Sequence, residues 1–322
     1  MVADHSTDRG RVVTRTAVVI GCGGTIGGAW IVAALAALAG ETGLNPSEVD
    51  LLQGTSAGAE LVTMLASGTS IDELVAMHRG HAGDRRLRDH IAATPPGLPP
   101  LPSPRPLHPA LVRRRPGLAG LTGLAPTGRG DAAWLQRLGE AFTTEDGWLP
   151  HSDARMIAYD VGTGERVALG APTAPPVSVG EALRASWAIP GWMPPVRLGE
   201  SVLVDGGAAS TASVDLLVDD NIDLAYVIAP MASVPGQRPP GLGGVIEDRI
   251  LRRPMSATLT REIAVLRSTG TSVIPIVPST DDLRGLGANF MRRSHRRAAF
   301  EAAMTTVPVT VRAALSENAS HA

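Results

Sequence analysis

Short apolar runs alternate with glycine-rich turns along the first part of the chain. Ala17–Ile20 has the pattern of a buried strand and is followed by the turn "GCGGTIGG" and a predicted helix over Ala29–Ala39. A second apolar run, Val49–Leu52, leads through "QGTSAGA" into a helix that we expect to end near Ala66. Strand, tight turn and helix, repeated in this order, predict a parallel sheet with helices on its faces.

The pattern resumes after a proline-rich interruption. Residues 94–130, which include "TPPGLPPLPSPRPLHP", hold too many prolines for a helix or a central strand. A segment of this length is expected to form a long loop or lid over one face. Beyond it we predict helices at about Asp131–Phe142, Val179–Trp187, Ser213–Val218 and His295–Leu315, and strands at Met156–Val161, Val167–Leu169, Ser201–Val204, Leu224–Ala229 and Val273–Val277. The expected fold is a three-layer α/β/α sandwich around a mostly parallel sheet, with a proline-rich flap.

Composition narrows the class of protein further. We expect one domain over residues 16–316, between polar tails at 1–15 and 317–322. A net charge of −2 argues against a nucleic-acid binder, which would carry a dominant basic face. Cys22 is the only cysteine, so no internal disulfide forms and a cytoplasmic location is expected. Neither a signal peptide nor a membrane-spanning segment is predicted, whereas peripheral contact with a membrane stays open.

One serine has the sequence context of a nucleophile. Gly54–Gly58 fits G-x-S-x-G, in which the serine occupies a sharp turn between a strand and a helix, and the crowded backbone leaves no room for flanking side chains. "GTS" also occurs at Gly68–Ser70 and Gly270–Ser272, but only the first copy follows a strand, gains a second glycine and opens a helix. Context therefore selects Ser56. The alternative, a plain helix N-cap, explains the serine but not the glycines.

The glycine-rich turn after the first strand favours an oxyanion hole over a nucleotide site. Counted from Gly21, the dinucleotide fingerprint needs a third glycine where Ile26 stands, and no Gly-Lys-Ser/Thr follows as in a P-loop. Glycines allow backbone N–H groups to approach the negative oxygen of a tetrahedral intermediate, and the next helix adds the positive end of its dipole. The alternative is a turn that only joins strand to helix.

A base for the serine is best sought at Asp205. It ends an apolar strand in "VLVDGGAAS", and strand ends meet in the crevice outside a parallel sheet, where Ser56 is also expected. An aspartate with its ordinary pKa near 3.9 is a weak base at neutral pH, so burial would have to raise that pKa. The alternatives are a turn-forming aspartate at 205, or a histidine base at His151 or His295, although neither histidine follows a strand.

These elements, in this order, resemble the patatin-like phospholipases, in which a glycine-rich oxyanion loop, a G-x-S-x-G nucleophile and a late D-G-G/A motif build a Ser–Asp dyad. "ASWAIPGWMPPV" at Ala185–Val196 and "LGANFMRRSHRRAAFEAAM" are also similar to segments of that family, so the resemblance runs from about residue 17 to 310. It implies a serine acyl hydrolase that cleaves carboxylic esters of lipids through an acyl-enzyme, without a cofactor.

Carried over by position, the resemblance implies roles for individual residues. Ser56 would be the nucleophile and Asp205 the base that accepts its proton. The implied oxyanion donors are the N–H groups of Gly23, Gly24 and Ala57, and the remaining motif glycines are Gly27, Gly54, Gly58, Gly206 and Gly207. The family loop runs G-G-G-x-R/K-G, whereas here Cys22 replaces the first glycine and Ile26 the basic residue. The missing cation weakens the expectation of a phosphate-bearing substrate and would also fit impaired activity.

The sequence allows two interpretations of the aromatic residues near Asp205 and of the arginine clusters. Trp187, Trp192 and Met193 would line an acyl groove or belong to the core. The arginines within 113–115 and 292–297 would meet anionic lipid head groups or form a solvated face. The function itself has alternatives: an acyltransferase or small-ester esterase with the same dyad, or a catalytically weak binding protein. Acyl chain length, head group and oligomeric state are not encoded in any motif.

No metal site is predicted. His78 and His81 form the only close pair of potential ligands, and no carboxylate or cysteine completes the set.

Overall fold

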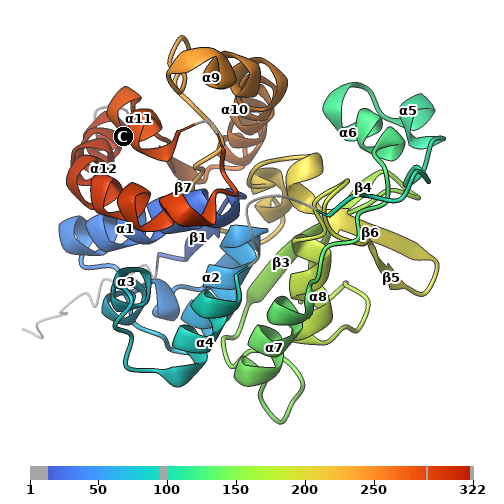
Figure 1. The fold of residues 1–322 in the computed structure, drawn as a ribbon. Helices are drawn as coiled ribbons and strands as arrows, with labels where there is room; N and C mark the ends of the chain where they lie inside the picture. The colour runs from blue at the N-terminus through green and yellow to red at the C-terminus, as the bar shows by residue number, and fades with distance from the viewer. Residues whose placement is uncertain (1–13, 95–99, 288, 320–322) are drawn as a thin grey trace, which may run out of the picture.

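An eight-stranded sheet forms the centre of the protein (Figure 1), in a computed structural model that describes residues 14–94, 100–287 and 289–319. The strands are β1 (Thr16–Ile20), β2 (Leu51–Thr55), β3 (Ala154–Asp160), β4 (Glu165–Leu169), β5 (Val196–Leu198), β6 (Ser201–Asp205), β7 (Leu224–Ile228) and β8 (Ser272–Ile276). Their order is β5-β6-β3-β2-β1-β7-β8, with β4 paired to β3. The parallel part of the sheet consists of β1, β2, β3, β7 and β8. The pairs of β4 with β3, β6 with β3 and β5 with β6 are antiparallel. The predicted mostly parallel sheet is confirmed.

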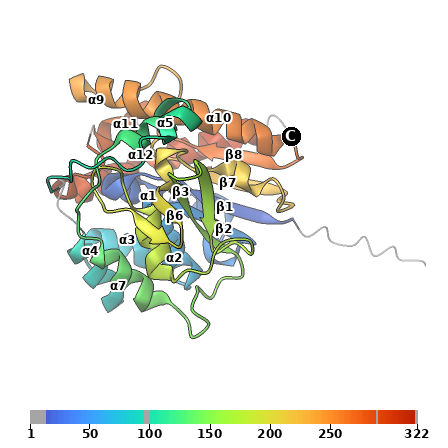
Figure 2. The same ribbon diagram turned by 90° about the vertical axis from the view of Figure 1, so that its right-hand side faces the viewer.

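Helices cover both faces of this sheet (Figure 2). They are α1 (Gly24–Thr42), α2 (Ala57–Ala66), α3 (Ile71–Arg79), α4 (Arg85–Ala93), α5 (Leu111–Arg114), α6 (Gly117–Leu121), α7 (Ala133–Phe142), α8 (Val179–Ser186), α9 (Gly241–Glu247), α10 (Arg253–Arg267), α11 (Thr280–Leu286) and α12 (Arg296–Ala319). Alternate residues of β1 face opposite cores: Val18 and Ile20 pack with α1, α2 and α12, whereas Ala17 and Val19 pack with α10. The predicted three-layer architecture is therefore present.

Helix α1 lies in the core. It has the length and apolar composition of a membrane-spanning helix, yet 67% of that stretch is buried inside the protein, where it packs against α12. It begins at Gly24, so the predicted start at Ala29 was wrong. Glycine is a poor helix former, which is why the sequence suggested a longer turn. A Cβ at Gly27 would lie 3.3 Å from the Pro230 ring, so this glycine serves close packing within the helix.

The proline-rich segment holds more regular structure than its composition suggested. Residues 95–99 lie outside the described residues; the remainder contains α5, α6 and a short 3₁₀ helix at Thr122–Leu124. Its two arms run antiparallel, because the N–H of Ser103 donates to Thr127 and the N–H of Thr127 donates to Arg105. An isolated bridge joins Pro106 to Pro126. The segment is therefore a folded excursion rather than an extended loop.

The ends of the chain differ from the predicted tails only in part. The expected tail at 1–15 lies outside the described residues except for residues 14 and 15. The backbone N–H of Arg15 bonds to the Asp223 carboxylate at 2.7 Å, which fixes the start of β1. At the other end α12 continues to Ala319, beyond the predicted domain limit at residue 316.

Strand β1 is the point at which the strand order reverses. The chain proceeds from β1 to β2 and β3 on one side, and later places β7 and β8 on the other. In open α/β sheets a crevice forms at such a point, outside the carboxyl ends of the strands. The glycine-rich turn follows β1 and the G-x-S-x-G turn follows β2, so both predicted motifs open into the same crevice.

Candidate active site

Ser56 occupies a strained turn between β2 and α2. Its backbone has φ 57° and ψ −118°, a left-handed conformation that is rare for a residue with a side chain. The turn is tight enough that a Cβ at Gly58 would lie 2.1 Å from the carbonyl oxygen of Ile20, and one at Gly54 would lie 2.4 Å from that of Gly58. The Ser56 side chain makes no capping bond to its helix, so the N-cap interpretation was wrong.

A second serine holds this turn in place. The N–H of Ser56 donates to the Oγ of Ser186 at 2.9 Å, and that hydroxyl donates to the carbonyl oxygen of Ile157 at 2.7 Å. Ser186 is fully buried at the end of α8. It lies in the "ASWAIP" stretch that the sequence analysis matched to the family, but nothing in the sequence alone assigned it this contact.

Asp205 lies beside the Ser56 side chain. It is 5% exposed, and one of its carboxylate oxygens accepts the N–H of Gly207 at 2.7 Å. Burial raises the pKa of Asp205 to about 7, although the neighbouring Ser56 side chain and the N–H of Gly207 act in the opposite direction. The requirement stated from the sequence, that burial bring this pKa near neutrality, is met.

The two side chains meet for a different reason from the one we predicted. Strand β6 runs antiparallel to β3, so the carboxyl end of β6 does not belong to the parallel set. Asp205 pairs with Ala158 of β3. The residue before it in β3, Ile157, pairs with Thr55 at the end of β2. The offset register of β6 therefore brings its last residue beside Ser56. Turn geometry also contributes, because a Cβ at Gly206 would lie 2.7 Å from the carbonyl oxygen of Ile157.

The glycine-rich turn presents backbone donors toward the same point. Gly23 caps α1, and Gly24 has φ +57° with Phe290 so close that a Cβ would lie 2.6 Å from its ring. The N–H groups of Gly23, Gly24 and Ala57 have no acceptor among the described residues. The starts of α1 and α2 thus carry unpaired N–H groups and the positive ends of their helix dipoles, which favour an anion.

The two departures from the family loop lie in different places, Ile26 in the core and Cys22 beside Asp205. Ile26 is 1% exposed and belongs to the main core, so the absent cation leaves apolar packing in its place. Cys22 is also buried, and its thiol lies 3.5 Å from the hydroxyl of Thr211. Burial, together with the nearby Asp205 charge, raises the pKa of Cys22 to about 12, so the thiol stays neutral.

An apolar cavity of about 310 Å³ opens onto Ser56 and Asp205. Part of its wall comes from the proline-rich segment and part from the residues around α9 and α10. Besides the two reactive side chains, the lining includes Cys22, Gly23, Gly24, Leu118, Leu121, Thr122, Ala125, Ile189, Pro190, Gly207, Ala208, Met231, Leu251, Met255 and Phe290. We call this space the catalytic cavity.

The tryptophans named from the sequence do not line it. Trp187 is 1% exposed and packs edge-on against Trp134 with ring centroids 5.4 Å apart, so its assignment to the core is the correct one. Trp192 and Met193 line a different depression beside Trp134. The acyl-facing residues Leu118 and Ile189 were missed, because nothing in their local sequence separates them from ordinary apolar positions.

The alternative histidine bases lie elsewhere. A ring nitrogen of His151 bonds to the carbonyl oxygen of Val49 at 2.8 Å, and one of His295 to that of Gly285 at 2.9 Å. Neither ring lines the catalytic cavity. Within the described ranges, no cluster of three or more His, Cys, Asp or Glu side chains is arranged to hold a metal ion.

The basic clusters are partly engaged within the protein. Arg115 pairs with Glu165, and Arg114 donates to the carbonyl oxygen of Gly162. Arg293 donates to the backbone at the end of α4, including the carbonyl oxygen of Thr94 at 2.9 Å. These arginines therefore fasten the proline-rich segment and α4 to the rest of the fold, and their contact with lipid head groups stays a prediction.

A serine on a strained strand-to-helix turn, with a buried carboxylate and unpaired N–H groups nearby, resembles the arrangement of serine hydrolases. The family model described as patatin-like phospholipase matches residues 18–218, more than half of the chain, so the protein belongs to that family, whose members are generally lipid acyl hydrolases. Among solved structures, VipD from Legionella pneumophila is similar, with 15% identity, a TM-score of 0.41 and coverage of 89% of this chain and 67% of that one. No curated protein matches the sequence.

Proposed function

We propose that the protein is a serine acyl hydrolase for carboxylic esters of lipids, with Ser56 as nucleophile and Asp205 as general base. The observation that carries the proposal is the position of the strained Ser56 beside the buried Asp205 carboxylate, where both line one apolar cavity. A pKa of about 7 suits the carboxyl group both to accept and to return a proton near neutral pH.

The reaction needs only groups already described. Ser56 Oγ attacks the ester carbonyl carbon while its proton passes to Asp205. The carbonyl oxygen becomes an oxyanion, for which the N–H groups of Gly23, Gly24 and Ala57 are the proposed donors, each worth about 10²–10³ in rate. The C–O bond to the alcohol then breaks, and Asp205 returns the proton to the departing oxygen. Water attacks the acyl-enzyme in the same way and releases the carboxylic acid.

The surroundings of the cavity favour a lipid as substrate. Aliphatic side chains such as Leu118, Ile189 and Leu251 dominate its lining, which suits an acyl chain better than a polar acyl group. Exposed apolar side chains lie at or next to its lining: Leu121 on α6, which lines the cavity, is 55% exposed, and Ile250, the neighbour of the lining residue Leu251, is 56% exposed. We propose that these positions contact the surface of a lipid aggregate when substrate enters.

Hydrolysis of p-nitrophenyl esters with two to sixteen carbons tests the function. We expect activity that is optimal on medium or long chains and that is lost in Ser56→Ala. The matched control is Ser67→Ala at the other end of α2, whose hydroxyl bonds only to the carbonyl oxygen of Thr63 and which should keep full activity. Labelling of Ser56 by a fluorophosphonate, located by mass spectrometry, is expected in parallel.

The outcomes separate the candidate functions. An optimum on acetate would identify a small-ester esterase, and ester consumption that depends on an added alcohol acceptor would identify an acyltransferase. Absence of both hydrolysis and labelling in folded protein would refute the proposal and favour a binding role.

A further inference from the structure

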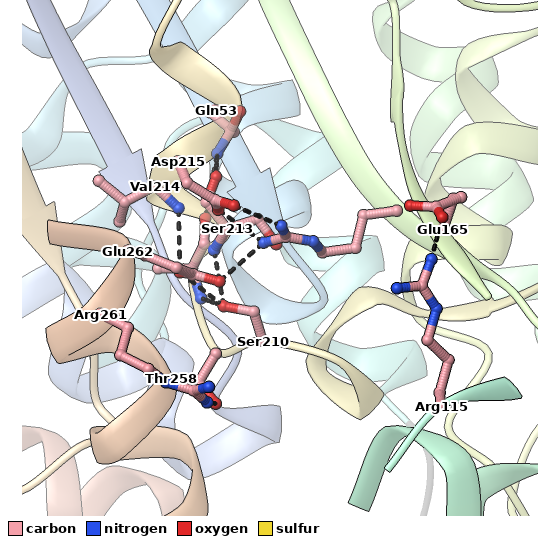
Figure 3. A network of polar contacts seen from close by, with 12 residues as sticks. Gln53, Arg115, Glu165, Ser210, Ser213, Val214, Asp215, Thr258, Arg261 and Glu262 are labelled. Atoms are coloured by element: carbon pink, nitrogen blue, oxygen red, sulfur yellow. Dashed lines mark hydrogen bonds and ion pairs between the residues drawn. The ribbon is translucent and has the colours of Figure 1, made fainter. Parts of the chain in front are cut away.

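A second pocket, of about 520 Å³, adjoins the catalytic cavity. The two spaces share Leu118, Gly207, Ala208 and Met255 as lining residues, so they meet along one wall. The N–H of Gly207 is the group that bonds to the Asp205 carboxylate, and the shared wall therefore lies next to the reacting groups. We call this second space the polar pocket, because charged side chains from the proline-rich segment, β4 and α10 surround it (Figure 3).

The charges of the polar pocket are unequally paired. Arg166 is held by Asp215 at 2.6 Å and by Glu262 at 2.7 Å. Arg115 pairs with Glu165, which is 66% exposed in its side chain and free to turn toward solvent. Figure 3 shows the Arg115–Glu165 pair at the right and the side chains of Asp215 and Glu262 nearer the centre.

The third arginine of the polar pocket has no carboxylate partner. Arg261 donates only within its own helix, to the carbonyl oxygen of Ala257 at 3.2 Å and to the hydroxyl of Thr258 at 3.1 Å, and it forms no ion pair with any described residue. Its side chain lies at the solvent side of the pocket, so this positive charge is available to a ligand.

An unpartnered hydroxyl also lines the polar pocket. Tyr159 of β3 is 1% exposed, and its hydroxyl oxygen has no hydrogen-bond partner in the described part of the chain. A buried hydroxyl without a partner costs about 1–3 kcal/mol, and such groups are rare in native proteins. A ligand oxygen in the pocket would supply the missing acceptor.

We propose that the polar pocket binds a phosphate monoester on the alcohol half of the substrate, while the acyl chain occupies the catalytic cavity. Arg261 supplies the opposing charge, the Tyr159 hydroxyl donates a hydrogen bond, and Arg115 turns from Glu165 to the ligand. Asp215 and Glu262 also face the pocket, and Arg166 neutralises them. The phosphate stays bonded to the alcohol throughout, so it takes no part in bond making. This assignment rests on the proposed ester hydrolysis.

The assignment bears on the basic residue missing from the oxyanion loop. At that position Ile26 is buried in the core and faces neither pocket. The cation available to a phosphate group is instead Arg261 of α10, which lines the polar pocket. Loss of the loop cation is therefore compatible with a phosphate-bearing substrate in this chain.

Two soluble substrates with the same acyl chain test the assignment: 1-hexanoylglycerol 3-phosphate and 1-hexanoylglycerol. We expect Arg261→Gln to lower kcat/KM by about tenfold for the phosphate ester and by less than about twofold for the neutral ester, since a hydrogen bond to a charged group contributes about 1.5–3 kcal/mol and this one is partly exposed. The control is Arg85→Gln on α4, whose side chain is 85% exposed and lines neither pocket. Tyr159→Phe should show a smaller loss with the same selectivity.

A binding measurement keeps the test independent of turnover. Calorimetric titration of Ser56→Ala with glycerol 3-phosphate should give saturable binding that is weakened about tenfold by adding Arg261→Gln. Inorganic phosphate should bind more weakly, because it lacks the glycerol contacts at the shared wall.

The outcomes distinguish the two levels of inference. If neither ester is hydrolysed but glycerol 3-phosphate binds through Arg261, the proposed function fails and the phosphate site stands. If both esters are hydrolysed and Arg261→Gln affects them equally, the phosphate assignment is overturned while hydrolysis stands. Equal affinity for glycerol 3-phosphate and inorganic phosphate would also overturn it, because the site would then be one for free phosphate.

Discussion

Two buried carboxylates lie on either side of the turn that follows β6, and they differ in their partners. Asp205 and Glu262 are each 5% exposed, and burial raises the pKa of both. Asp205 faces a cavity, and its contacts are the Ser56 hydroxyl and the N–H of Gly207. Glu262 is closed in by Arg166 at 2.7 Å, the Ser210 hydroxyl at 2.8 Å and an N–H at 3.2 Å.

The difference shows how partners assign a role to a buried acid. Three fixed donors hold the carboxylate of Glu262, so it ties α10 to the loop at 210–214 (Figure 3). That loop also accepts two hydrogen bonds from Gln53 on β2, and so connects the strand that carries Ser56 to α10. Asp205 instead lies beside the Ser56 hydroxyl, in a cavity that is open to a ligand. Equal burial thus yields a structural anchor in one case and a candidate base in the other.

The largest expected contrast is in turnover. Asp205→Asn removes the proton acceptor but keeps the shape, and we expect kcat to fall by about 10³-fold or more. Glu262→Gln keeps an oxygen acceptor at the anchor and should cost less than about tenfold. Steady-state hydrolysis of one p-nitrophenyl ester by both purified variants measures the difference. Comparable losses in the two would mean that the carboxylates act as one unit and that the distinction drawn from their partners is wrong.

For the stability of the fold we expect the reverse order, with the larger loss from substitution of Glu262. Glu262→Ala leaves the Ser210 hydroxyl and the N–H of Val214 without their acceptor and leaves Arg166 with Asp215 alone, and we expect the free energy of unfolding to fall by about 3 kcal/mol. Asp205→Asn should instead stabilise the protein at pH 8. The pKa of Asp205 is raised from 3.8 to about 7 in the folded state, so its burial destabilises the fold progressively as pH rises through that window.

The size of the destabilisation by ionised Asp205 follows from the difference between its folded and unfolded pKa values. Full ionisation of Asp205 above about pH 7 costs on the order of 4 kcal/mol relative to the protonated form, and at pH 4 the cost is nearly absent. Urea unfolding of wild type and Asp205→Asn at both pH values measures it. If wild type and Asp205→Asn differ equally in stability at pH 4 and at pH 8, the pKa of Asp205 is not raised in the folded protein.

A smaller, graded effect is expected in the pH profile of hydrolysis. The base must be ionised to accept the Ser56 proton, so kcat/KM should rise with pH and level off above about pH 7, the pKa of Asp205. Glu262→Gln should leave this midpoint within a few tenths of a pH unit, since Glu262 does not line the catalytic cavity and accepts no proton in the proposed reaction. A midpoint that moves with Glu262→Gln, or that lies near pH 4, contradicts the assignment of the base.

Local sequence was sufficient where backbone crowding dictated the residues. The turns around Gly54–Gly58 and the glycine-rich loop can be formed by few other sequences, because neighbouring atoms lie where a Cβ would stand. Ser56 was selected as a candidate by this means, and Asp205 by its place at the end of an apolar strand. The family match over residues 18–218 also agrees with the resemblance drawn from those motifs.

The remainder depends on contacts between distant segments. Register, which no local pattern encodes, places Asp205 beside β2, so the two candidate residues lie together for a different reason from the expected parallel crevice. Helices α3, α4, α9, α10 and α11 were not predicted, and the charged helix α10 forms one wall of the polar pocket. The proline content of residues 94–130 concealed α5 and α6, which pack beside that pocket.

The smallest expected effect concerns Cys22, the third ionisable group of this region. Its thiol lies beside Asp205, but burial and that negative charge raise its pKa to about 12, so it carries no charge for either carboxylate to pair with. Cys22→Ala should therefore change kcat/KM by less than about threefold, and iodoacetamide should modify the folded wild type only slowly, because the thiolate is the reactive form. Rapid alkylation that abolishes hydrolysis would show an ionised thiol at the site, and Asp205 would then no longer be the only group able to take up the serine proton.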